Sequence, residues 1–150
     1  MQRSISNQNS LTPFLYVVIF IPYIVLSSIH LFLPPLLAIL YVLFSRALKK
    51  NDLTSLLLVC FSLVLFEAEK GYVLFSTLIY FAFIYRYIIP KIAKIINCNI
   101  CVKMATVILV YIGFFVFNIF LSNIFLMPSP SINYYVIYYI MIEFFILSIL

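Results

Sequence analysis

Long apolar runs separated by short polar breaks dominate this chain and decide what it can fold into. Apolar residues make up 67% of the 150 residues and charged residues 9%, against roughly half and roughly a quarter in an ordinary soluble domain. These proportions exclude a water-soluble fold. The runs are continuous and lack the apolar/polar alternation of a transmembrane β-barrel, whereas a helix satisfies its own backbone hydrogen bonds in lipid. The sequence therefore predicts an all-α, polytopic transmembrane bundle.

Six apolar runs, broken by Pro, Gly or charge, are the candidate membrane spans. They are Leu11–Ile29, Leu33–Leu48, Leu53–Phe66, Tyr72–Ile89, Val102–Leu126 and Tyr134–Leu150. At about 20 residues a span, we expect residues 1–150 to form a single integral membrane domain, with almost no residues left for a domain outside the membrane. The third run is short, because its 14 positions cover only about 21 Å of a hydrocarbon core about 30 Å thick. Pro34 and Pro35 indicate a turn and a helix start, and Pro90 indicates the end of a span.

The distribution of positive charge predicts the orientation of these spans. With six spans and a cytoplasmic N-terminus, the inner segments would hold eight of the nine basic residues: Arg3, Arg46, Lys49, Lys50, Arg86, Lys91, Lys94 and Lys103. Inner loops of membrane proteins carry such an excess. Both termini are therefore expected in the cytoplasm of a bacterial inner membrane, and the net charge of +5 needs no nucleic-acid partner.

The stretch FEAEKG concentrates three of the thirteen charged residues, Glu67, Glu69 and Lys70, just before Gly71. We expect a tight external hairpin here, with Gly71 in the left-handed conformation that ends many helices. Two interpretations stay open for the charges. They are solvated on an exposed turn, or they bind a partner protein or a ligand.

Glu143 lies midway along the last apolar run, where an ionised acid costs roughly 2.5 to 3.5 kcal/mol. Its candidate partners are Arg86 on the fourth run and Asn118, Ser122 or Asn123 on the fifth, or the acid is protonated and donates a hydrogen bond. Three roles are possible for Glu143: a contact between helices, a proton or ion path, and a contact with a partner within the membrane.

Motifs that would support catalysis or a cofactor are weak. Cys98 and Cys101 form a CxxC pair, but a zinc site needs four ligands, and the other cysteine and the single histidine, Cys60 and His30, lie elsewhere. The sequence has no HExxH helix, phosphate-binding glycine loop or paired intramembrane aspartates. We therefore expect no enzyme, no metal and no cofactor.

Two stretches resemble the MreD family of rod-shape-determining membrane proteins. LVLFEAEKGYVLFSTLIY is similar to the family's pattern of an acid ending a Leu-rich span and a Gly soon after, with Glu67 and Gly71 at those positions. LFLPPLLAILYVLF is similar to the family's proline-led second span, although Pro35 stands where the family has Asp. A second family Gly would fall near Phe75, and this chain has only two Gly residues.

The resemblance implies a non-enzymatic scaffold in the bilayer that supports cell-wall elongation and cell shape. Its expected partners are an MreC-like periplasmic protein and other elongation proteins, with Glu67, Glu69, Lys70 and Gly71 as the expected docking residues. The alternative is a small transport component, either a substrate-binding membrane subunit or a permease, with Glu143 and polar residues of the fifth span lining a cavity at membrane depth.

Overall fold

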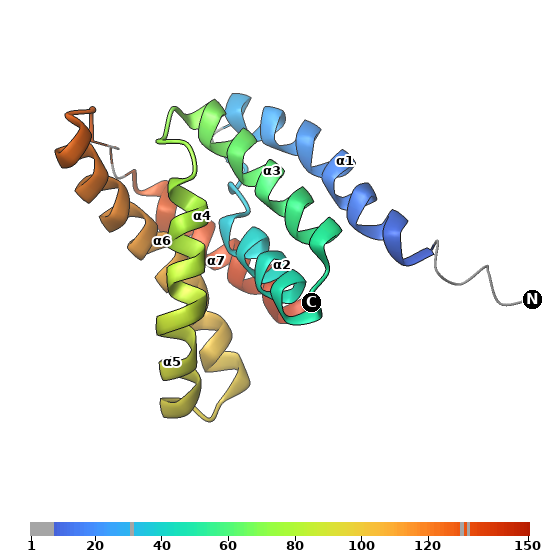
Figure 1. Ribbon diagram of the computed structural model, residues 1–150. Coiled ribbons are helices and arrows are strands. Elements are labelled where there is room, and N and C mark those ends of the chain that lie inside the picture. Colours follow the sequence, from blue (N-terminus) through green and yellow to red (C-terminus); the bar gives the residue numbers. More distant parts are fainter. Residues whose placement is uncertain (1–7, 31, 130, 132) are drawn as a thin grey trace, which may run out of the picture.

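The structure, a computed structural model, describes residues 8–30, 32–129, 131 and 133–150, and all regular structure in these residues is helical (Figure 1). The elements are α1 (Gln8–Ile29), α2 (Leu37–Lys50), α3 (Leu53–Lys70), α4 (Ser76–Phe83), the π-helical turn η1 (Ile84–Ile88), α5 (Ile89–Ile95), α6 (Asn99–Phe125) and α7 (Tyr135–Ile149). Each of the six apolar runs forms one helical segment, so the all-α prediction is confirmed. Arg3 lies outside the described residues.

The fourth segment is continuous through α4, η1 and α5 and passes Pro90, which the sequence analysis had placed at its end. Proline lacks an N–H donor and its ring crowds the carbonyl four residues earlier. That carbonyl belongs to Arg86, within the widened π turn of η1. Single π turns occur within α-helices, and here one directly precedes Pro90, beyond which the helix continues to Ile95.

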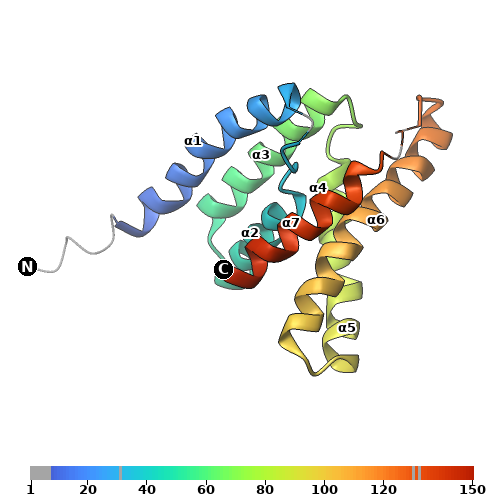
Figure 2. The same cartoon turned by 180° about the vertical axis from the view of Figure 1, so that it is seen from behind.

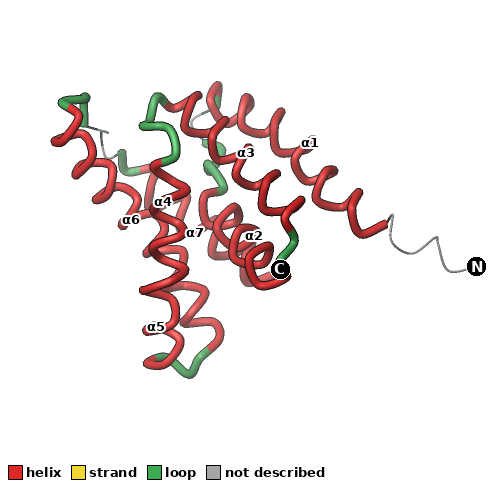
Figure 3. Tube along the Cα trace, viewed as in Figure 1, coloured by secondary structure: helices red, strands yellow, loops and turns green. Residues whose placement is uncertain are grey.

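The helices alternate in direction between two ends of the bundle (Figures 1 and 2). One end holds the α1–α2, α3–α4 and α6–α7 connections. The opposite end holds the α2–α3 and α5–α6 connections and the C-terminus. The α2–α3, α3–α4 and α5–α6 connections are short, as the trace in Figure 3 shows. We call the second end the basic end, because Arg46, Lys49 and Lys50 close α2 there and Lys94 and Lys103 flank the α5–α6 connection.

The core forms where α2, α4 and α6 meet. Ala38, Phe81, Val107 and Val110 are completely buried, and the rings of Tyr41 and Phe81 pack edge to face with their centroids 5.2 Å apart. α4 approaches α6 closely at a glycine. A Cβ atom on Gly113 would stand 1.8 Å from the hydroxyl oxygen of Tyr80, which donates a hydrogen bond to the carbonyl of Leu109 (2.8 Å).

Outside this core, large apolar side chains are exposed on every segment except α2. Examples are Phe14 on α1, Leu57 on α3, Phe120 on α6 and Phe145 on α7, each more than half exposed. Among the described helices, α6 alone is both long and apolar enough to cross a membrane by length and composition, and Phe14–Ile29 and Tyr135–Ile149 are shorter apolar helices. These features are weak evidence for membrane association.

Candidate functional site

Glu67 lies in the last turn of α3 and is completely buried. Its carboxyl oxygens accept hydrogen bonds from the backbone N–H groups of Phe75 and Thr77, both at 2.5 Å, and from the hydroxyl group of Ser76 at 3.1 Å. The hydroxyl group of Thr77 donates a further bond. The residue therefore joins the end of α3 to the start of α4.

Glu67 caps the N-terminus of α4, because the residues at the start of that helix provide no side-chain cap of their own. The cap residue, Phe75, has a φ of 67° and makes no capping hydrogen bond with its own side chain. The first N–H groups of a helix have no partner within the helix, and a carboxyl group near them also interacts favourably with the helix dipole. The prediction that Glu67 is a solvated charge on an exposed turn is therefore wrong, because the side chain is buried against the start of α4.

The predicted hairpin also needs correction. Glu67, Glu69 and Lys70 belong to the last turn of α3, and the connection consists of Gly71–Phe75. Gly71 has a φ of 71° and ends the helix, so its predicted left-handed conformation is confirmed. The helix is thereby four residues longer than the apolar run, because the buried Glu67 keeps this turn ordered. Glu69 and Lys70 are exposed.

Lys70 and Gly71 share a small cavity of about 390 Å³ with Asn118 of α6. Ser129 and Asn133, from the α6–α7 connection, also line it. Within this cavity the side-chain amide of Asn118 donates to the carbonyl of Phe114 (3.0 Å) on its own helix. The structure thus brings together three predicted site residues from distant parts of the chain. We call the exposed Glu69 and Lys70 with this cavity the α3-end surface.

Glu143 is completely buried in α7 and contacts two other helices. Its carboxyl group accepts the backbone N–H of Ala38 (2.7 Å), at the second position of α2, and the hydroxyl group of Tyr111 in the middle of α6. Like α4, α2 begins after a left-handed apolar residue, Leu36 (φ 54°), with no side-chain cap of its own. Glu143 therefore does for α2 what Glu67 does for α4.

The side chains that the sequence suggested for Glu143 are not the donors of these bonds. Arg86 in η1 and Asn123 on α6 are exposed. The side chain of Asn118 bonds within α6, and the hydroxyl group of Ser122 donates to the carbonyl of Ile119 (2.8 Å). Neither Tyr111 nor the backbone N–H of Ala38 was among the predicted partners. For Ala38 the available signal is the Pro34–Pro35 pair, which marks a helix start whose free N–H groups need an acceptor.

The basic end carries two further polar contacts. The ammonium group of Lys103 donates to the carbonyl of Leu147 (3.0 Å), a typical basic contact at a helix C-terminus, and so joins α6 to α7. Cys98 and Cys101 are exposed, and a hydrogen bond from Cys101 lowers the pKa of the Cys98 thiol. No group of three metal-ligating side chains occurs in the part of the chain that the structure describes.

Comparisons with protein-family models, with curated proteins and with solved structures find no match to this chain. The functional argument therefore depends on the geometry above. In that geometry both buried acids accept hydrogen bonds at helix starts, and most of the exposed charges lie near the ends of the bundle.

Replacing Glu67 by Gln should destabilise the protein, although the two side chains have almost the same shape. An amide offers one acceptor oxygen and turns its NH₂ group toward donors, so at least one buried N–H loses its partner, at a cost of about 1–3 kcal/mol. Unfolding of the purified protein in detergent, followed by circular dichroism during titration with SDS, measures the difference. Glu69→Gln is the matched control, since Glu69 is exposed two residues later, and it should unfold as the wild type does. Equal stability of all three proteins would contradict the assigned contacts.

Proposed function

We propose that this chain is a six-span protein of the bacterial inner membrane and that it acts as a non-enzymatic scaffold, similar to MreD, in cell-wall elongation and cell shape. The observation that carries the proposal is the use of both buried acids, Glu67 and Glu143, as hydrogen-bond acceptors for helix starts. Buried acids that bond to the backbone hold helices in place. Acids of a proton path or a substrate site would instead have to be accessible to water or to the substrate.

The arrangement of charge supports the membrane setting. The basic end gathers most of the cations, and the opposite end carries Glu69, Lys70 and the polar α6–α7 connection. This separation is what the positive-inside rule predicts for a bundle whose basic end faces the cytoplasm. The exposed apolar side chains between the two ends then contact lipid.

The α3-end surface supports the choice of a scaffold, because it offers a partner exposed charges on a well-anchored turn. Glu67 anchors the turn by accepting a hydrogen bond from Phe75 at the start of α4, and Gly71 ends α3. Charges held this way steer a partner and set its orientation more than they add affinity. An MreC-like periplasmic protein is the partner we propose for this surface.

The orientation can be tested by thiol labelling. In a variant lacking the three native cysteines, a single cysteine introduced at Glu69 should react with a membrane-impermeant maleimide in intact cells, because that end faces outward. A variant retaining only Cys98 should react only after the inner membrane is opened. Labelling of Cys98 alone in intact cells would reverse the orientation, and labelling of both positions would contradict the six-span proposal.

The partner can be tested by charge reversal at the α3-end surface. Glu69→Lys should reduce co-purification of an MreC-like protein about fivefold, which corresponds to the loss of an exposed ion pair of about 1 kcal/mol. Asp52→Lys is the matched control, since Asp52 is an exposed acid at the other end of α3, and it should leave the partner bound. Membrane levels of both variants should equal the wild type.

Depletion of the whole protein separates the scaffold from the alternative. A scaffold predicts rounded or swollen cells and slower wall synthesis. Normal shape and wall synthesis, combined with loss of uptake of a small solute, would overturn the scaffold and favour a transport component.

A further inference from the structure

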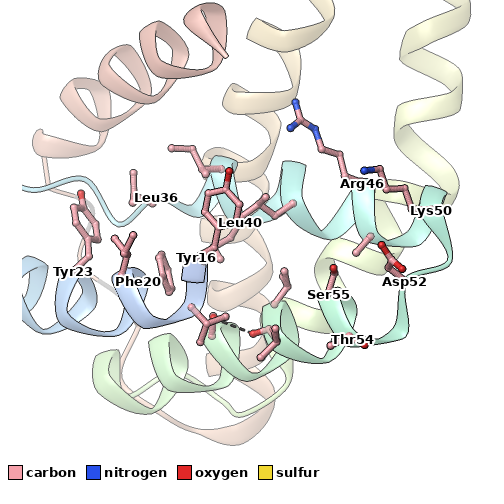
Figure 4. A pocket seen from close by; sticks show the side chains of 18 residues that line it. Tyr16, Phe20, Tyr23, Leu36, Leu40, Arg46, Lys50, Asp52, Thr54 and Ser55 are labelled. Atoms are coloured by element: carbon pink, nitrogen blue, oxygen red, sulfur yellow. Dashed lines mark hydrogen bonds between the residues drawn. The ribbon is translucent and has the colours of Figure 1, made fainter. Parts of the chain in front are cut away.

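A groove of about 910 Å³ runs along the first three helices. α3 packs against both α1 and α2, and the groove lies between them, with side chains of all three helices in its wall (Figure 4). Its volume is in the range of small-ligand sites, about 300–1,000 Å³. Neither buried acid lines it, so the groove is separate from the contacts that hold the bundle together.

One face of α2 forms the length of the groove and changes character along it. Leu40 and Leu43 line its first part, and Arg46 and Lys50 line its last part. These positions are three or four residues apart, so they share one face of the helix. Leu36, which precedes the helix, also lines the groove, and the 14 residues of α2 are about 21 Å long. The α2 face of the groove is therefore apolar at Leu40 and Leu43 and cationic at the basic end.

The other two helices match this division. Phe20 of α1 lies against the apolar part of the groove. At the charged part, Thr54 and Ser55 of α3 contribute hydroxyl groups, and Asp52, the residue before α3, contributes a carboxyl group. Two cations and one acid leave this part with a formal charge of +1. Arginine and lysine side chains are donors that suit a phosphate group.

We propose that the groove binds one anionic phospholipid of the bilayer, with an acyl chain along α2 and the phosphodiester at Arg46 and Lys50. The proposal goes beyond the scaffold role and uses only its membrane setting. A single negative charge matches the excess charge of the groove.

The test measures binding of phosphatidylglycerol to the delipidated full-length protein by native mass spectrometry, with phosphatidylethanolamine and inorganic phosphate as separate ligands. Arg46→Gln combined with Lys50→Gln should weaken binding of phosphatidylglycerol about tenfold, while Asp52→Asn should strengthen it. The matched control combines Lys49→Gln with Arg86→Gln, two exposed cations outside the groove, and should change binding less than twofold. Leu43→Trp, which fills the apolar part, should weaken binding without a change of charge.

Several outcomes would overturn the proposal. An equal loss in the control variant would show general charge attraction, and equal binding of phosphatidylethanolamine would show no preference for an anionic lipid. Competition by inorganic phosphate without any effect of Leu43→Trp would show a site for free phosphate. Unchanged lipid binding in the Arg46→Gln/Lys50→Gln variant, together with loss of a co-purifying protein, would assign the groove to a protein partner. Size-exclusion profiles like that of the wild type show that each variant is folded, and the labelling experiment tests the membrane setting separately.

Discussion

Two buried carboxyl groups that accept backbone N–H groups at helix starts are the contacts on which this bundle depends. Glu67 of α3 holds the start of α4, and Glu143 of α7 holds the start of α2. In each case the residue before the helix, Phe75 or Leu36, is in the left-handed region, which costs an apolar residue about 1–2 kcal/mol. An unsatisfied N–H in an apolar environment costs several kcal/mol, so the acceptor outweighs the strain and fixes the turn.

These contacts also explain how short helices form one core. α2 has 14 residues and no large exposed apolar side chain, and it lies among α3, α6 and α7. Its start is fixed by Glu143, which also contacts Tyr111 of α6, so three helices meet at one acid. With α2 held in this way, its remaining face is free to line the groove beside α1. The buried acids thus fix the positions of the surfaces that carry exposed charge.

The helices and the turn at Gly71 could be predicted from the sequence because both depend on residues that are close together in the chain. Run length predicts each segment, and the lack of a Cβ atom predicts the left-handed turn at Gly71. Burial of Glu67 could not be predicted in the same way, since its acceptor role appears only when α4 folds back onto α3. The prediction of the partners of Glu143 was wrong for a related reason. Charge and side-chain polarity suggested Arg86 and Asn118, whereas the donor at Ala38 is a backbone N–H group, which every residue except proline carries.

Hydrogen exchange of individual backbone amides tests the central claim most directly. In the wild-type protein the amides of Ala38 and Thr77 should both be protected. Glu143→Gln should speed exchange at Ala38 and leave Thr77 protected, and Glu67→Gln should speed exchange at Thr77 and leave Ala38 protected, because each acid holds one helix start. Unchanged exchange at both amides in both variants would contradict the account and show that these helix starts are held by other contacts.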